Sequence, residues 1–172
     1  DPKFDKFYEN FMNKFFDERI NPSGKLALFS ESVDTLKYLY NRIKEDIGRS
    51  DVLMVTASNR GNLGETIKEN FDANCKKDAK KYNIIITSDV LAEGVNLHRS
   101  NVIVNYDSPW NATRLMQRIG RVNRIGSVAP NIYNFMFYPS QQGDNEIRLY
   151  KNALVKLQGF HSAYGEDAQI FS

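Results

Sequence analysis

Apolar residues recur at steps of three and four along several segments, which predicts amphipathic helices. These segments span residues 3–20, 32–48, 63–74 and 145–158. The first carries an aromatic stripe that includes Phe4, Phe7, Phe11 and Phe15, and the turn-forming run 21–24 ends it. Ser32 is placed to cap the second helix, whose inward face is predicted to begin with Val33.

Short apolar runs alternate with these helices and predict strands. They lie at residues 25–30, 51–56, 82–88, 101–106 and 131–138. Three of them are continuously apolar, which is typical of strands buried on both faces. The alternation predicts an α/β fold with an open, mostly parallel sheet and helices on both faces.

The composition fits a single soluble domain. The chain has 172 residues, 41% of them hydrophobic and 26% charged. Its formal net charge is only +2, so any phosphate binding must come from local placement of cations. One cysteine and two histidines argue against a disulfide framework or a metal site, and we expect neither.

No targeting or membrane segment stands out along the chain. There is no apolar stretch of about 18 residues and no basic-then-apolar leader. We therefore expect a cytoplasmic protein with no membrane partner. The chain begins at Asp1 without a methionine, so we expect a piece of a longer protein.

Polar residues gather where the predicted strands end. Ligands of open α/β sheets bind beyond the carboxyl ends of the strands. Three of the four segments found there begin with hydroxyl residues, at Ser30, Thr56 and Thr87. Short hydroxyls at such ends suit contacts to phosphate or sugar, although ordinary helix capping is the alternative, above all at Ser32.

The segment 117–126 carries the strongest chemical signal. Between Ser108 and Gly143 there is no Asp or Glu, and the only cations are Arg114, Arg118, Arg121 and Arg124. On a helix these four fall within an arc of roughly 120°. Arginine offers a planar fork of donors that matches phosphate oxygens. A row of arginines without nearby acids predicts a phosphate site.

Several residues have two interpretations. Arg114 and Arg118 fit either a functional contact or a structural role, and Trp110 fits either base stacking or packing. The lysines at 76, 77, 80 and 81 form either a solvated charge run or a nucleic-acid contact. His98 is expected in a turn near the surface.

The spacing of these features forms a compound pattern. Thr87-Ser88-Asp89 and Glu93-Gly94-Val95-Asn96-Leu97 precede a strand, and Gln117-Arg118-Ile119-Gly120-Arg121-Val122-Asn123-Arg124 follows it. This pattern resembles motifs V and VI of the superfamily two helicases and translocases. The run 25–30 resembles their motif IV strand. The opening Asp1-Pro2-Lys3 and the ending Arg124-Ile125-Gly126 look most like the bacterial Swi/Snf-like subgroup.

The resemblance implies roles for residues around a nucleotide. Arg121 and Arg124 match the two motif VI arginines that face the γ-phosphate, with Arg124 as the arginine finger. Such a cation can raise the rate about 10³–10⁵-fold. Gln117 matches the residue that links nucleotide and nucleic-acid contacts. Gly94 and Asn96 match positions near the ribose, although the DEAD-box group has Asp where this chain has Asn96.

The resemblance also implies a nucleic-acid path. Ser30, Thr56, Thr87 and Ser88 match positions near the phosphate backbone of the tracked strand, and Arg118 is a further candidate. Contacts to the backbone hold a strand without reading its sequence. DNA is the expected partner, because Glu93 replaces a basic residue of the DEAD-box RNA helicases.

Two expected motifs do not occur in the sequence. It contains no Gly-x-x-x-x-Gly-Lys-[Ser/Thr] phosphate loop and no Asp-Glu-x-[His/Asp] magnesium box. In the family both belong to an N-terminal RecA-like domain, which would supply most of the contacts to ATP and Mg²⁺. We expect residues 1–24 to be a lead-in helix, 25–142 the second RecA-like domain, and 143–172 a closing helix and tail.

Three alternatives remain beside the motor half of a DNA helicase or double-strand translocase. One is the corresponding half of an RNA helicase, and another is a RecA-like scaffold without catalysis. The paired Arg121 and Arg124 argue against a scaffold, which needs no arginine fingers. A dehydrogenase is disfavoured because no Gly-x-Gly-x-x-Gly follows a predicted strand.

Overall fold

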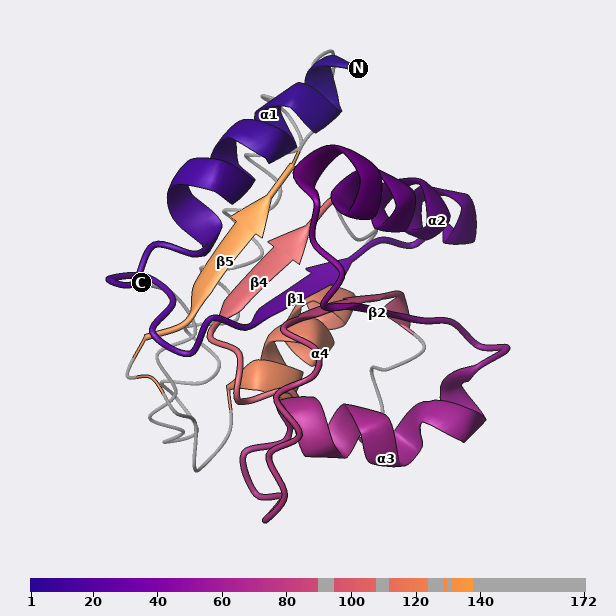
Figure 1. The fold of residues 1–172 in the computed structure, drawn as a ribbon, viewed down its shortest axis with the longest axis vertical. Helices are drawn as coiled ribbons and strands as arrows, with labels where there is room; N and C mark the ends of the chain where they lie inside the picture. Colours follow the sequence, from indigo (N-terminus) through magenta and orange to yellow (C-terminus); the bar gives the residue numbers. More distant parts are fainter. Residues whose placement is uncertain (90–94, 108–111, 124–128, 130, 138–172) are drawn as a thin grey trace.

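Five parallel strands form one sheet in the order β2-β3-β1-β4-β5 (Figure 1). The structure is a computed structural model that describes residues 1–89, 95–107, 112–123, 129 and 131–137, without the side chains of 112 and 113. The strands are β1 (Leu26–Phe29), β2 (Val52–Val55), β3 (Ile84–Thr87), β4 (Val102–Asn105) and β5 (Tyr133–Met136). The predicted parallel α/β sheet is confirmed.

The three central strands are buried along their whole length. Every residue of β1, β3 and β4 is buried, whereas the residues of β5, at one edge, are only partly buried. A strand covered on both faces has no polar side, which explains the continuous apolar runs in the sequence.

The first two helical segments cover one face of the sheet. They are α1 (Pro2–Asn10), continued by a π-helical turn η1 (Phe11–Phe15), and α2 (Val33–Arg42), continued by η2 (Ile43–Ile47). The predicted aromatic stripe packs here: Phe7 contacts Phe11, Phe15 and, from the sheet side, Tyr106. Figure 1 shows α1 running beside β5.

Capping residues define the ends of α2 and η2. Ser32 Oγ accepts a hydrogen bond from the Thr35 amide at 3.3 Å, which confirms the predicted cap. Gly48 ends the segment with φ of 79°, a conformation that glycine adopts at little cost. The inward position predicted for Val33 is wrong, since its side chain is 45% exposed in the first turn, beyond the end of β1.

The other face of the sheet is covered by α3 (Arg60–Phe71) and α4 (Ala112–Val122). Ile67 and Phe71 of α3, with Leu115 and Ile119 of α4, pack against the sheet in a second core. Helices therefore lie on both faces, as predicted. The predicted helix 145–158 lies outside the described residues. Within the described part of the chain, no helix is long and apolar enough to cross a membrane.

Candidate functional site

Three hydroxyl residues line up at the carboxyl edge of the sheet. Phe29 of β1 pairs with Thr87 of β3, and Thr87 pairs with Val55 of β2. The next residues along the three strands are Ser30, Ser88 and Thr56, which therefore lie at one level across the sheet. The structure thus brings together residues that were predicted from separate parts of the sequence.

Ser30 is held by an acidic residue from the end of β4. Its hydroxyl donates to the carboxylate of Asp107, which also accepts the Glu31 amide at 3.1 and 3.2 Å. The Ser32 amide donates to Ser30 Oγ at 3.3 Å. Ser30 is buried, so its hydroxyl fixes the turn between β1 and α2. Asp107 was not predicted to have a role, because no local pattern links it to Ser30.

The other strand-end hydroxyls also have partners within the domain. Thr87 is buried and its hydroxyl donates to the Val55 carbonyl at 3.0 Å, which joins the ends of β3 and β2. The Thr56 hydroxyl lies 2.8 Å from Ser58 Oγ, and the Thr56 amide donates to Asn59 Oδ1 at 2.8 Å. Ser88 is half-buried. These bonds join the end of β3 to β2 and the end of β2 to the turn that follows it.

Arg118 lies in the interior of the domain. Its side chain is fully buried, and its guanidinium donates to Asp89 Oδ1 at 2.6 Å and Oδ2 at 3.1 Å. It also donates to Asn105 Oδ1 at 2.9 Å and lies over the Phe29 ring at 5.2 Å. The nucleic-acid contact predicted for Arg118 stays a prediction, but this guanidinium already has three acceptors within the domain.

The expectation of an arginine row without acids is wrong for two of its members. Arg114 donates to Glu31 Oε1 at 3.1 Å, and Arg118 pairs with Asp89. Glu31 and Asp89 follow the ends of β1 and β3, far from these arginines in the sequence. A stretch of sequence without acids can therefore still have acids beside it in the fold.

Arg121 forms hydrogen bonds with the segment 95–97, which ends the part of the chain that resembles motif V. Its guanidinium donates to the Val95 carbonyl at 3.4 Å, and its own carbonyl accepts the Leu97 amide at 2.8 Å. Asn96 lies between these two contacts and is half-buried. Gln117 is exposed one helical turn before Arg121. Three residues predicted around the nucleotide therefore lie together in the fold.

Some predicted residues lie outside the described part of the chain. They are Gly94, Arg124 and Trp110. Their predicted roles stay predictions. Among the described residues, no group of three or more His, Cys, Asp or Glu side chains could hold a metal ion.

A pocket of about 460 Å³ opens beside Asp107, between the first turns of α1 and α2. Lys3 lines it with its ammonium 4.5 Å from the centre of the Tyr106 ring. Burial lowers the pKa of Lys3, while the charge of Asp107 acts in the opposite direction. Burial also raises the pKa of Tyr106 to about 12. Among the described residues predicted to contact the nucleotide, none lines this pocket.

His98 is buried, and the prediction of a surface turn is therefore wrong for its side chain. Its Nδ1 accepts the Ala73 amide at 3.4 Å and lies 3.7 Å from an Asp72 oxygen. The imidazole connects the chain before β4 to the residues that follow α3. Nothing in the sequence near His98 predicts this long-range contact.

Comparisons with known proteins agree with this fold. The family model described as helicase conserved C-terminal domain matches residues 3–126. An uncharacterized ATP-dependent helicase of Bacillus subtilis, YqhH, is 46% identical over 87 residues, which is 50% of this chain and 15% of the relative. The C-terminal part of the Fun30 ATPase domain superposes with a TM-score of 0.63 at 18% identity, over 80% of this chain and 41% of that one.

Other relatives differ in the nucleic acid that their names mention. A probable ATP-dependent RNA helicase of Dictyostelium discoideum, ddx51, is 29% identical over 60% of this chain and 18% of its own length. The ATP-dependent DNA helicase mph1 of Neurospora crassa is 23% identical over 72% of this chain and 11% of its own length. This chain therefore spans less than a fifth of the length of these relatives.

Proposed function

This chain belongs to the helicase conserved C-terminal domain family, and we propose that it is the second motor domain of an ATP-dependent DNA helicase or double-strand DNA translocase. In this role it contributes arginine fingers and contacts to the nucleic-acid backbone. The phosphate loop and the magnesium box, which this sequence lacks, belong to a first RecA-like domain of the parent protein.

The observation that carries the proposal is the position of Arg121. Its two contacts to the segment 95–97 place the guanidinium of this half-buried residue at the end of α4, next to Asn96 and one turn after Gln117. A planar cation held by the backbone is a preorganised group for stabilising charge on a phosphoryl group. These residues suit an ATP phosphate, and ATP supplies the phosphoryl group that is transferred to water.

The contribution of this chain is therefore to position cations. Arg121 and Arg124 stabilise negative charge at the γ-phosphate, and the buried Arg118–Asp89 pair holds the helix that carries them. Because both fingers act on a nucleotide held by another domain, closure of the two domains switches the site on.

The strand-end hydroxyls support the nucleic-acid part of the proposal. Ser30, Thr56 and Ser88 lie level across three neighbouring strands. Half-buried Ser88 is the hydroxyl of this edge placed to contact a phosphate without reading bases, whereas buried Ser30 and Thr56 bond within the domain and fix the strand ends beside it. A motor that moves along a strand needs this kind of contact, because its affinity for the strand must not depend on the base sequence.

DNA is preferred over RNA for reasons found in the sequence. Glu93, Asn96 and the ending Arg124-Ile125-Gly126 depart from the DEAD-box pattern and resemble the Swi/Snf-like subgroup. The runner-up is the motor half of an RNA helicase, which the names of several relatives favour. A scaffold without catalysis is the third candidate, and an upstream sequence lacking a phosphate loop would favour it.

The test is the ATPase activity of the full-length parent protein with duplex DNA, single-stranded DNA or RNA. We expect stimulation by DNA and a loss of about 10³–10⁵-fold in kcat for Arg124→Ala, with a comparable loss for Arg121→Ala. Arg19→Ala is the control, since this arginine is 89% exposed and pairs locally with Asp17. Stimulation by RNA alone would contradict the choice of DNA, and full activity of Arg124→Ala would contradict the motor role.

A further inference from the structure

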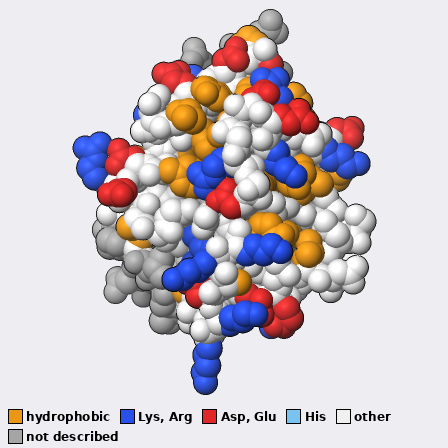
Figure 2. Space-filling model, in the orientation of Figure 1, with side chains coloured by type: hydrophobic (Ala, Val, Ile, Leu, Met, Phe, Trp, Pro, Cys, Tyr) orange, Lys and Arg blue, Asp and Glu red, His pale blue; other side chains and the backbone are white. Residues whose placement is uncertain are grey.

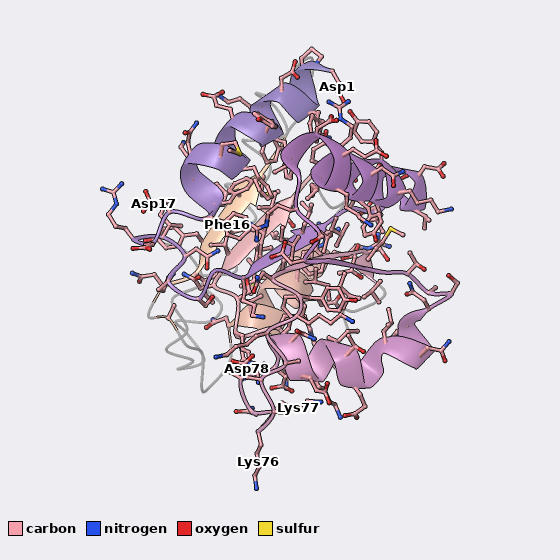
Figure 3. All side chains as sticks on the ribbon, in the orientation of Figure 1. Asp1, Phe16, Asp17, Lys76, Lys77 and Asp78 are labelled. Carbon is pink, nitrogen blue, oxygen red and sulfur yellow. The ribbon has the colours of Figure 1, made fainter. Side chains whose placement is uncertain are left out.

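A rigid loop rich in lysine lies at the edge of the sheet opposite to the candidate site. This lysine loop (residues 72–81) joins α3 to β3, so it lies at the amino ends of the parallel strands. Figure 3 shows Lys76 extending away from the body of the molecule at this end. The proposed function does not use this loop.

Buried Arg99 holds the lysine loop in place. Only 8% of Arg99 is exposed, and its guanidinium donates to the carbonyls of Glu69 at 2.6 Å, Cys75 at 3.0 Å and Lys77 at 2.9 Å. It also binds the Asp78 carboxylate at 3.2 Å. One side chain from the turn before β4 thus fixes the middle of the loop.

Asn70 fixes the end of the same loop. It is almost fully buried, and its Oδ1 accepts the amides of Lys81 at 2.9 Å and Tyr82 at 3.0 Å. The Ala79 amide donates to the Glu69 carbonyl at 2.9 Å. The loop therefore presents its exposed side chains from an ordered backbone, which lowers the entropy that binding must remove.

Lysines exceed acids on the surface of this loop. Glu69 pairs with Lys77 at 3.3 Å, Asp78 pairs with Arg99, and Asp72 lies mostly buried beside His98. Lys76, Lys80 and Lys81 are exposed and form no ion pair with an acid in the described part of the chain. Three ammonium groups within six positions therefore form no ion pair within the described residues, and the one of Lys81 lies 5.3 Å from the centre of the neighbouring Tyr82 ring.

The backbone at Lys80 adopts a conformation that its residue type disfavours. Its φ is 52°, and it is the one non-glycine residue with positive φ among those described. Such a conformation persists only where surrounding contacts enforce it, and the chain bends at the next residue, Lys81. The side chains of Lys80 and Lys81 are consequently presented at this bend.

We propose that Lys76, Lys80 and Lys81 form a second contact to the phosphate backbone of nucleic acid, outside the motor site and at the opposite edge of the sheet. Three ammonium groups on a fixed frame attract a polyanion without reading its sequence. This inference rests on the proposed function, because a translocating motor is what brings a long nucleic acid to the domain.

The surroundings of the loop favour nucleic acid over an acidic protein. Protein interfaces have an apolar core. The large hydrophobic residues that are exposed in the described part of the chain are Tyr8, Met12 and Val33, which lie on α1, η1 and α2 on the other side of the sheet. On the face seen in Figure 2, the lower end carries Lys or Arg beside Asp or Glu, with little apolar surface.

The test measures the affinity of the full-length parent protein for duplex DNA by fluorescence anisotropy over a salt series. The variant K76Q/K80N/K81Q removes three charges, and asparagine is chosen for position 80 because it tolerates a positive φ. Its matched control is K6Q/K14Q/K37Q, three exposed lysines of α1, η1 and α2. Thermal unfolding of each variant checks that the fold is kept.

Affinity falls as salt rises, so the slope of log affinity against log salt concentration is negative. For K76Q/K80N/K81Q we expect the magnitude of this slope to be smaller by about 2 to 3, since each phosphate contact contributes about 0.9. The control should retain the wild-type slope. Equal slopes for wild type and K76Q/K80N/K81Q would overturn the inference, as would an equal fall in both variants.

The same samples separate this inference from the proposed function. If wild-type protein hydrolyses ATP in response to DNA but K76Q/K80N/K81Q keeps the wild-type salt slope, only the second contact is wrong. If wild-type protein shows no response to any nucleic acid, the proposed function itself fails. Loss of binding to a polyglutamate peptide with unchanged DNA binding would identify an acidic protein partner and overturn the choice of nucleic acid.

Discussion

The guanidinium of Arg118 binds both carboxylate oxygens of Asp89, although the two residues lie 29 positions apart in the sequence. Arg118 is fully buried and Asp89 is 20% exposed. The same guanidinium reaches Asn105 and covers the Phe29 ring. One side chain of α4 therefore contacts the carboxyl ends of β1, β3 and β4, and it sets the position from which α4 presents Arg121.

Replacing Arg118 should destabilise the domain strongly. Arg118→Met leaves the Asp89 carboxylate and Asn105 without their buried donor, and breaking such a pair costs about 3–5 kcal/mol. Urea unfolding monitored by circular dichroism measures the change. The control is Arg114→Ala, because the Arg114–Glu31 pair is 47% and 23% exposed and should contribute less than about 1 kcal/mol.

A double-mutant cycle tests whether the loss belongs to the pair. Asp89→Asn in the Arg118→Met background should cost much less than Asp89→Asn alone, since the carboxylate has already lost its buried guanidinium and keeps only the longer, 3.9 Å contact to Arg114. Additive losses would contradict a direct coupling between the two side chains. An unchanged urea midpoint for Arg118→Met would contradict a structural role for the arginine.

Removing Arg99 should loosen the lysine loop. Arg99→Met leaves the carbonyls of Glu69, Cys75 and Lys77 without this donor. We expect a loss of about 1–3 kcal/mol and faster tryptic cleavage after the lysines of residues 76–81. Peptide mapping by mass spectrometry locates the cuts. Arg19→Met is the control, and equal cleavage of the two variants within 76–81 would contradict the anchoring role.

The alternation of strands and helices was predictable because each element carries its own pattern. The buried strands β1, β3 and β4 are apolar except at Thr87 and Asn105, which end β3 and β4, and Ser32 and Gly48 mark helix ends by their chemistry. The candidate site was predictable in part for the same reason. Register places Ser30, Thr56 and Ser88 together once the strands are known to be parallel.

The partners of individual side chains could not be predicted from local spacing. Arg118 and Arg121 lie on one helix, three residues apart, yet one is buried against Asp89 and the other is half-buried against Val95. The difference in burial between the two arginines depends on the path of α4 across the ends of the strands. The Ser30–Asp107 bond has the same origin, because 77 positions separate the two residues. Only tertiary structure determines such contacts.

Asp51 should make stability depend on pH in the acidic range. The side-chain hydrogen bonds from Arg49 lower its pKa below the usual value of 3.8, and Asn83 acts in the same direction while burial opposes them. A carboxyl with a depressed folded-state pKa stabilises the fold above its unfolded pKa, and this contribution disappears as pH falls through the folded pKa. The pH range in which this contribution to stability is lost therefore lies below about pH 4–5.

The variant Asp51→Asn tests this dependence. At pH 7 we expect it to be less stable than wild type by about 1 kcal/mol, because the Arg49 pair is partly exposed to solvent. Urea midpoints of both proteins should converge as pH falls from 5 to 2.5. Glu18→Gln, a change at an exposed acid, should show no such convergence. A constant gap between Asp51→Asn and wild type over this range would contradict the role of the carboxylate.

The isolated 172-residue chain should have negligible ATPase activity. Arg121 and Arg124 can stabilise charge on a phosphoryl group, but the sequence contains no phosphate loop to hold the nucleotide and no magnesium box. Phosphate release from ATP, with and without duplex DNA, should stay at background for the purified chain and rise when the first motor domain of the parent protein is supplied. Turnover of the chain alone that is well above background and abolished by Arg124→Ala would show that the chain holds a complete site.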